Sequence, residues 1–158
     1  MKDSQYWIKH LNLEPHPEGG YFRRIYQSNV MIPTKTGDRH STTAIHYLLE
    51  AGDFSAWHRI QQDEMWFHHQ GDPLIIRSIN SQGQLIELIL GPEHHISTCI
   101  EANTWFCSEL FVSQDTYSLV SCVVSPGFDF ADFEMGNKDE LVNLYPQHRD
   151  IICRLCRD

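Results

Sequence analysis

Residues 52–71, GDFSAWHRIQQDEMWFHHQG, contain the side chains best suited to proton transfer in this chain. Successive side chains of a strand point to opposite faces, so Glu64, Trp66 and His68 are expected to share one face. His58 lies on the preceding strand, and the turn at 61–63 predicts a hairpin that brings His58 opposite Glu64. If this face lines the interior, one cavity holds a histidine, a carboxylate, an indole and a second histidine.

His58 and Glu64 are the candidate catalytic pair. Abstraction of a proton beside a carbonyl needs a base whose pKa lies near the working pH, and a histidine oriented by a carboxylate supplies one. Trp66 and His68 are then expected to contact the substrate. The alternative is a buried hydrogen bond between His58 and Glu64 that serves only the fold, because buried ionisable pairs also occur in purely structural networks.

A second group of polar side chains lies in residues 16–28, HPEGGYFRRIYQS. Its two glycines permit backbone angles or close approaches that other residues forbid. Glu18, Arg23, Arg24 and Tyr26 are candidates for further polar groups of the pocket, with Arg23 and Tyr26 binding substrate. An edge strand whose arginines limit aggregation explains the same residues equally well.

The elements that must position these residues are mostly strands. A short helix is expected over 4–11 behind an Asp3 or Ser4 cap, and helices over 139–145 and 148–156 are expected to pack outside. Many short strands separated by glycine-rich turns predict an all-β sandwich or barrel. The strand-like runs cover 21–28, 42–49, 54–60, 64–69, 73–79, 84–90, 95–100, 104–110 and 117–124.

Composition fits one globular domain over residues 1–158, with 41% hydrophobic residues and a formal net charge of -9. The negative charge and the absence of any run of Lys or Arg argue against a nucleic acid or an anionic membrane as partner. The opening MKDSQYWIKH is too polar for a signal peptide, and no segment reaches the length of a membrane span. We expect a cytoplasmic protein whose partner is a small polar metabolite.

The chain contains 5 cysteines, an odd number that predicts reduced thiols in this setting. Cys153 and Cys156 form a lone C-x-x-C, with neither a second ligand pair nor a thioredoxin-like context nearby. We therefore expect these cysteines to pack as small apolar residues.

Three segments, 16–28, 43–74 and 117–135, carry the signatures HPEGGYF, SAWHR and PGFDF in this order. The chain resembles a largely uncharacterised family of small single-domain cupins, similar in fold to the dTDP-4-keto-6-deoxysugar epimerases. The resemblance covers nearly the whole chain. It implies a double-stranded β-helix, that is, a jelly-roll barrel, with a pocket inside and usually a dimer. The family usually has Trp-His-Phe where this chain has Trp66, Phe67 and His68.

The resemblance also allows a test for a metal. The spacing of Gly52, His58, Glu64 and Gly71 matches a cupin metal motif, but Ile60 replaces its second histidine. In the second motif, which should supply the last ligand, Phe106 stands at the ligand position. His58, Glu64 and His68 are the remaining candidates for a divalent metal, so the expectation is a chain without a cofactor.

Residues 125–133, SPGFDFADF, follow the last long strand and place three phenylalanines among acidic residues. This segment can fold over the barrel mouth as a lid, or it can pack as a plug against the outer helices, which is the expectation we adopt. Phe106 is counted with the substrate-binding candidates.

Two classes of function fit these residues. The first is an isomerase or epimerase of a sugar or nucleotide-sugar that uses His58 and Glu64 as an acid/base pair. The second is a metabolite-binding or sensing cupin without chemistry, and a metal-dependent cupin enzyme is a further alternative. The exposed strand at 21–28 predicts a homodimer, because pairing covers its free backbone groups.

Overall fold

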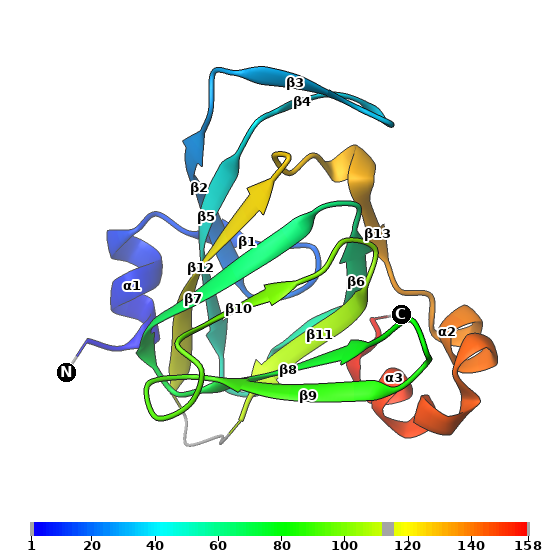
Figure 1. The fold of residues 1–158 in the computed structure, drawn as a ribbon. Coiled ribbons are helices and arrows are strands. Elements are labelled where there is room, and N and C mark those ends of the chain that lie inside the picture. Colours follow the sequence, from blue (N-terminus) through cyan, green and yellow to red (C-terminus); the bar gives the residue numbers. More distant parts are fainter. Residues whose placement is uncertain (1, 112–115, 158) are drawn as a thin grey trace.

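A computed structural model describes residues 2–111 and 116–157, and two antiparallel β-sheets make up most of it (Figure 1). The inner faces of the sheets pack on each other through a core that includes Tyr47 and Trp66 from one sheet and Leu74 and Phe106 from the other. This is the expected jelly-roll barrel. One sheet contains, in spatial order, β1 (Glu14–Pro15), β2 (Tyr21–Gln27), β5 (Thr43–Glu50), β12 (Tyr117–Ser125), β7 (Asp63–Gly71) and β10 (Ser97–Ile100), and the other contains β13 (Phe133–Met135), β6 (Phe54–Ile60), β11 (Trp105–Leu110), β8 (Leu74–Ile79) and β9 (Leu85–Leu90).

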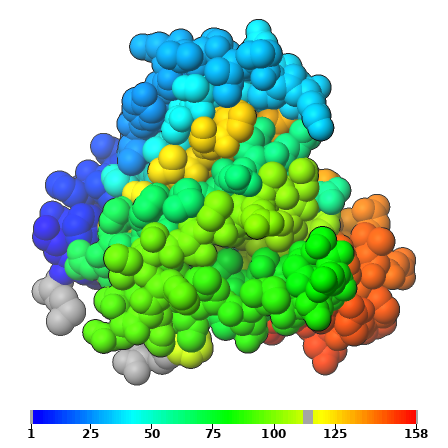
Figure 2. Space-filling view, viewed as in Figure 1, coloured from blue at the N-terminus to red at the C-terminus, as the bar shows by residue number. Residues whose placement is uncertain are grey.

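Each strand-like run predicted from the sequence forms a strand, with bounds that agree within two residues. The alternation of apolar and polar side chains was a sufficient signal for these strands. The sequence analysis missed β1, β13 and the hairpin of β3 (Met31–Thr34) and β4 (Gly37–His40). These strands are short, and β3 contains Pro33, which lowers the strand signal. The β3–β4 hairpin projects from the body of the molecule (Figures 1 and 2).

The sequence predicted a hairpin between β6 and β7, and this prediction is wrong. Strand β6 pairs with β11 and β13, whereas β7 pairs with β12 and β10 in the other sheet. The chain crosses between the sheets at 61–62, because β6 and β7 each carry apolar side chains that the interior must bury. His58 and Glu64 therefore come from facing sheets.

Helices cover the outside at two places. Helix α1 (Ser4–His10) begins at Asp3, whose carboxylate accepts the Tyr6 N–H at 2.8 Å, and Trp7 and Ile8 pack beside the six-strand sheet. Helices α2 (Lys138–Leu144) and α3 (Arg149–Leu155) pack on the outer face of β6 and β11, and the short turn η2 (Pro146–His148) between them contacts the Gly83 carbonyl. The predicted helices at both ends of the chain are confirmed.

The cysteines form no disulfide bond within the described residues. Cys156 is buried with Trp57 and Cys107 beneath the C-terminal helices, whereas Cys153 is exposed. Cys156 thus packs as a small apolar residue, as expected, whereas the expectation is wrong for Cys153, which lies on the exposed side of α3. None of the described helices has the length and apolar content that crossing a membrane requires.

Candidate functional site

A cavity of about 390 Å³ lies between the two sheets and opens at one end of the barrel. Its wall combines apolar and aromatic side chains with a few ionisable groups, the usual make-up of a small-molecule site. The lining residues are Glu14, His16, Glu18, Phe22, Arg24, Thr43, Ile45, Tyr47, His58, Ile60, Glu64, Trp66, Cys122, Val124, Phe128, Asp129, Phe130 and Phe133.

His58, from β6, contacts the buried carboxyl group of Glu18. The distance between His58 Nε2 and Glu18 Oε2 is 3.1 Å, and His58 Nδ1 lies 2.7 Å from the Ala56 carbonyl oxygen. A carbonyl oxygen only accepts, so Nδ1 must carry a proton. In the neutral ring Nε2 is then an acceptor, and its contact with Glu18 requires one proton between the two atoms. We call these two residues the Glu18–His58 pair.

Burial shifts both members of this pair toward their uncharged forms. It lowers the pKa of His58 from 6.5 to about 4, against the hydrogen bond to Ala56, and it raises the pKa of Glu18. The Ser55 hydroxyl donates to Glu18 Oε1 at 2.9 Å and partly offsets the shift of the Glu18 pKa. The geometry therefore places one proton between Glu18 and His58, and burial favours the form of the pair in which both groups are uncharged.

The HPEGG loop puts Glu18 in this position. The Glu18 carbonyl accepts the Ala56 N–H at 2.8 Å, which fixes the loop against β6. Gly19 has φ +113°, and a Cβ there would lie 2.0 Å from the Phe54 carbonyl oxygen. Only glycine permits this approach. The Gly19 carbonyl in turn accepts the buried Tyr47 hydroxyl at 2.7 Å, which holds the loop from the other sheet.

Glu64, from β7, lines the facing wall. Its pKa is raised from 4.5 to about 8, mainly by burial and also by the nearby Glu18 carboxyl, whereas the side chains of Trp66 and Cys122 partly oppose the shift. No arginine or lysine among the described residues forms an ion pair with Glu64. Glu64 thus mostly keeps its proton at neutral pH and can still lose it.

Trp66 follows Glu64 on the same face of β7 and also lines the cavity. Its indole Nε1 is buried and lies close enough to the Glu64 carboxyl group to lower that group's pKa, but it forms no hydrogen bond of good geometry within the described part of the chain. A buried donor without a partner costs free energy, so such a group often marks a place for a ligand.

Residues 125–133 form the wall at the cavity mouth. Phe128, Phe130 and Phe133 all line the cavity, and the centroids of the Phe128 and Phe130 rings lie 4.9 Å apart. The expected plug against the outer helices is therefore wrong, because the proline turn directs these rings over the barrel opening. We call residues 125–133 the mouth segment.

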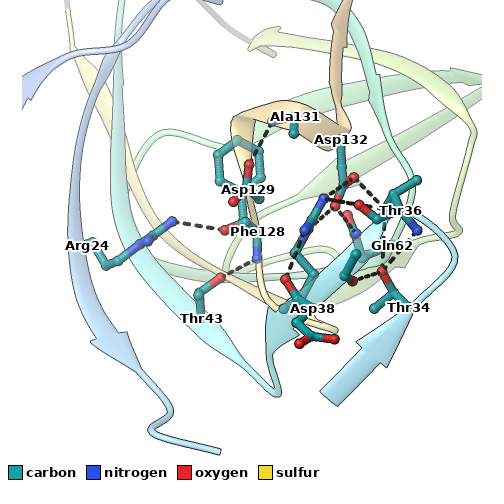
Figure 3. Close-up of polar contacts among 12 residues, drawn as sticks. Arg24, Thr34, Thr36, Asp38, Thr43, Gln62, Phe128, Asp129, Ala131 and Asp132 are labelled. Atoms are coloured by element: carbon teal, nitrogen blue, oxygen red, sulfur yellow. Dashed lines mark hydrogen bonds and ion pairs between the residues drawn. The ribbon is translucent and has the colours of Figure 1, made fainter. Parts of the chain in front are cut away.

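Two groups of hydrogen bonds anchor the mouth segment (Figure 3). Asp132 accepts from Arg39 Nε at 2.8 Å, Arg39 Nη2 at 2.9 Å, Gln62 Nε2 at 2.6 Å and the Thr36 hydroxyl at 2.8 Å. These donors lower the pKa of Asp132 to about 2, with Arg39 as the main cause. At the other end, the Phe128 N–H donates to Thr43 Oγ1 at 2.8 Å.

Four predicted site residues lie outside the cavity wall, and their proposed places are corrected here. His68 lies further along β7, where its Nε2 is 3.3 Å from the Asp72 carbonyl oxygen and where the ladder with β12 shifts register. Phe106 is buried behind His58, with 4.1 Å between the ring centroids. Arg23 and Tyr26 both lie on β2.

On β2 the residues that face the cavity are Phe22 and Arg24. Arg23 points to the opposite face, and its guanidinium donates to the Asn12 carbonyl at 3.4 Å. An irregularity in the pairing of β2 with β5 lies between Arg24 and Tyr26, and Tyr26 is 54% exposed. The strand was predicted correctly. Its composition could not show which of its side chains face the cavity or where its bulge lies.

The donor set does not fit a cupin-type metal. Both ring nitrogens of His58 have protein partners, Ile60 is part of the cavity wall, and Phe106 packs on the His58 ring. His68, the third ligand candidate, lies outside the cavity. The described residues contain no group of three or more His, Cys, Asp or Glu side chains arranged to hold a metal ion.

The sequence analysis did not identify the roles of Glu18 and His16 in the cavity. Glu18, which it named only as a possible polar group of the pocket, is the carboxylate that contacts His58. His16 also lines the cavity, accepts the Glu18 N–H on its Nδ1 at 3.2 Å, and has a pKa lowered by burial. The paired glycines of HPEGG were the available signal, because they mark a close backbone approach.

The fold and the cavity define a jelly-roll β-barrel protein with an enclosed site between its sheets. The Cupin superfamily (DUF985) profile matches residues 5–136, and the chain belongs to this family. No curated protein matches the chain.

Solved structures agree with this assignment. A hypothetical protein from Leishmania major is 33% identical with a TM-score of 0.91, and a protein from Shewanella oneidensis is 36% identical with a TM-score of 0.91; each match covers 99% of both chains. An oxalate decarboxylase from Lactobacillus farciminis, solved as a formate complex, is 14% identical, with a TM-score of 0.59 over 90% of this chain and 41% of that chain. At this identity the likeness concerns the fold alone.

Proposed function

We propose that this protein is an isomerase or epimerase that transfers protons on a small, sugar-like carbonyl compound bound in the cavity. One observation carries the proposal. Two proton-holding groups, Glu64 and the Glu18–His58 pair, line opposite walls of one enclosed cavity. Groups whose environments set their pKa values apart are the usual basis for assigning an acid and a base.

Glu64 serves as the base in this proposal. In its ionised form it removes a proton from the carbon beside the carbonyl, and the electron pair of the C–H bond moves to form an enol while the carbonyl oxygen takes up a proton from the Glu18–His58 pair. For isomerisation of an α-hydroxy carbonyl compound, protonated Glu64 returns its proton to the former carbonyl carbon while the hydroxyl on the first carbon gives its proton to the pair, which restores both groups. For epimerisation, the enol O–H returns its proton to the pair, which protonates the same carbon from the opposite face. Glu64 then passes its proton to the pair through solvent, and the starting state is restored.

These roles differ from the pair expected from the sequence. A histidine with a pKa of about 4 is a weak base at neutral pH, so His58 serves better as part of a proton donor. Glu64, with a pKa of about 8, is a much stronger base than an ordinary carboxylate. The carboxylate that orients the histidine is Glu18.

Exchange of substrate hydrogen with deuterium oxide tests the proposal. A metabolite panel is screened by thermal shift with and without divalent metals, and the compounds that bind are incubated with protein in deuterium oxide and followed by NMR. We expect deuterium to enter beside a carbonyl, with a loss of about 100-fold or more in Glu64→Gln and Glu18→Gln. Glu93→Gln, the same change at an exposed residue, should exchange like the wild type.

Ligands that bind without any exchange would contradict the enzyme and favour the binding or sensing alternative. Exchange that persists in Glu64→Gln would remove Glu64 as the base. Exchange that requires an added divalent metal would instead support the metal-dependent alternative.

We also retain the homodimer as a proposal. Ile25 and Tyr26 on β2 and Val30 and Met31 beyond it are between 49% and 61% exposed, which gives the outer strand an apolar surface for a second copy. Sedimentation at micromolar concentration should show a dimer, and a clean monomer would contradict it. The cytoplasmic location stays a prediction.

A further inference from the structure

We propose that the ligand of the cavity carries an ammonium group and at least one hydroxyl or carbonyl oxygen, and carries no phosphate. This inference deepens the proposed function, since it rests on the cavity as the substrate site and names the class of substrate. An amino sugar is the simplest compound with these groups. The nucleotide-sugar considered from the sequence is thereby set aside.

The charges in the cavity wall are the first argument. Glu14, Glu18, Glu64 and Asp129 contribute four carboxyl groups, whereas Arg24 is the one lysine or arginine among the residues that line the cavity. A phosphate or pyrophosphate would have to bind beside these carboxyl groups and would oppose the ionised form that Glu64 needs as a base, whereas an ammonium group favours that form.

Two of the five N–H donors of Arg24 are engaged within the protein. Its Nη2 donates to the Phe128 carbonyl at 3.2 Å (Figure 3), and its Nη1 donates to Gln27 Oε1 at 2.8 Å. Binding of phosphate would compete with a contact that holds the mouth segment. Arg24 is better explained as a support of the cavity mouth than as an anion site.

Aromatic rings around the mouth supply the second argument. Phe130 is 52% exposed at the rim, and its ring centroid lies 4.9 Å from that of Phe128 and 5.9 Å from that of Phe133. Asp129 lies between these residues in the chain and also lines the cavity. Ring faces next to a carboxylate attract an ammonium group through both cation–π and ionic interactions.

The third argument concerns the deep end. Trp66 Nε1 is a buried donor, on a side chain that is 1% exposed, and it forms no well-directed hydrogen bond within the described residues, although it is close enough to Glu64 to lower the pKa of that carboxyl group. A ligand hydroxyl or carbonyl oxygen would satisfy it. Glu64 is next to Trp66 on the same face of β7 and can accept an ammonium hydrogen bond. The wall thus offers acceptors for a cation together with one donor for an oxygen.

Compounds that share a scaffold and carry an amine, a hydroxyl or a phosphate group test the inference by calorimetry. One set is D-glucosamine, D-glucose and D-glucose 6-phosphate, and a second set is benzylamine, benzyl alcohol and benzyl phosphate. In at least one set we expect the amine to bind about tenfold or more tightly than the neutral compound, and the phosphate to bind least. Glu64→Gln should weaken the amine about tenfold and leave the neutral compound within about twofold, while Glu93→Gln should change neither.

The inference fails if no amine binds more tightly than its neutral counterpart, which includes the case in which nothing binds, or if a phosphate binds most tightly. These outcomes are independent of deuterium exchange. Exchange on a neutral or phosphorylated compound without any preference for the amine would retain the proton-transfer enzyme and remove this inference. A preference for the amine without exchange would retain this inference and remove the proton-transfer enzyme.

Discussion

The pKa values of two buried carboxyl groups, Glu64 and Asp132, are shifted in opposite directions. Glu64 lines the wall, is 8% exposed and has a pKa of about 8, whereas Asp132 anchors the mouth segment, is 3% exposed and has a pKa of about 2. Both side chains are almost inaccessible to solvent, but burial dominates the pKa of Glu64, whereas hydrogen-bond donors outweigh burial at Asp132. Asp132 has an arginine and two further side chains as donors, and Glu64 has no cationic partner in the described structure.

This comparison separates a structural carboxylate from a chemical one. Asp132 keeps its charge and ties the β3–β4 hairpin to the mouth segment, because Arg39 compensates the loss of water. Glu64 lacks such compensation and keeps a proton that it can exchange near neutral pH. Four experiments test this difference, in order of the size of the expected effect.

Asp132→Asn should have the largest effect. The change leaves the Arg39 guanidinium without its charged partner, and we expect the melting temperature at pH 7 to fall by about 5–15 °C. In the wild type the contribution of Asp132 is present above its unfolded pKa of 3.8 and is lost as the pH falls toward about 2, so the difference between the two proteins should shrink over that range. Circular dichroism melts between pH 2 and 7 measure it.

Asp38→Asn is the matched control for this change. Asp38 is an exposed neighbour of Arg39 on the same hairpin, and its loss should shift the melting temperature by at most about 2 °C. Equal effects of the two substitutions would mean that Asp132 is not the anchor.

Glu64→Gln should act in the opposite direction. The folded wild type holds a proton on Glu64 up to a pH of about 8, whereas the unfolded chain loses it near 4.5, so stability falls as the pH rises between these values. Glutamine removes this dependence, and the variant should melt about 5 °C or more above the wild type at pH 8, with little difference at pH 4.5. A constant difference across the range would show that the pKa of Glu64 is not raised.

Ser55→Ala should have a smaller effect. It removes the hydroxyl that donates to Glu18, which we expect to cost about 1 kcal/mol, or about 2–4 °C of melting temperature. Ser108→Ala is the matched control, since Ser108 is equally buried and its hydroxyl has no partner among the described residues. If both substitutions cost the same, the hydrogen bond to Glu18 contributes nothing.

Removal of metal should have the smallest effect. The residues at the cupin ligand positions do not form a suitable donor set, so incubation with EDTA should leave the melting temperature unchanged within about 1 °C. Elemental analysis should show far less than one transition metal per chain. One tightly held metal whose removal lowers the melting temperature would overturn the assignment of the cavity to metal-free proton transfer.

The strands, the barrel and the two ionisable side chains His58 and Glu64 that face its interior could be predicted from the sequence alone. Alternation along β6 and β7 placed His58, Glu64 and Trp66 toward the interior, because this pattern is local and needs no knowledge of pairing. The motif spacing also identified Gly52 and Gly71, although it could not tell their roles apart. A Cβ at Gly71 would lie 2.0 Å from the Tyr117 carbonyl oxygen, whereas nothing lies within 4 Å of one at Gly52.

The contacts between ionisable side chains could not be predicted from the sequence, because they join distant parts of the chain. Glu18 lies 40 positions before His58, and its contact depends on a glycine loop that docks on β6. The same holds for Asp132 and Arg39, which are 93 positions apart. Sheet membership, strand bulges and pKa values all arise from such distant contacts, because burial and charge partners are set by the whole packed barrel and not by neighbours in the chain.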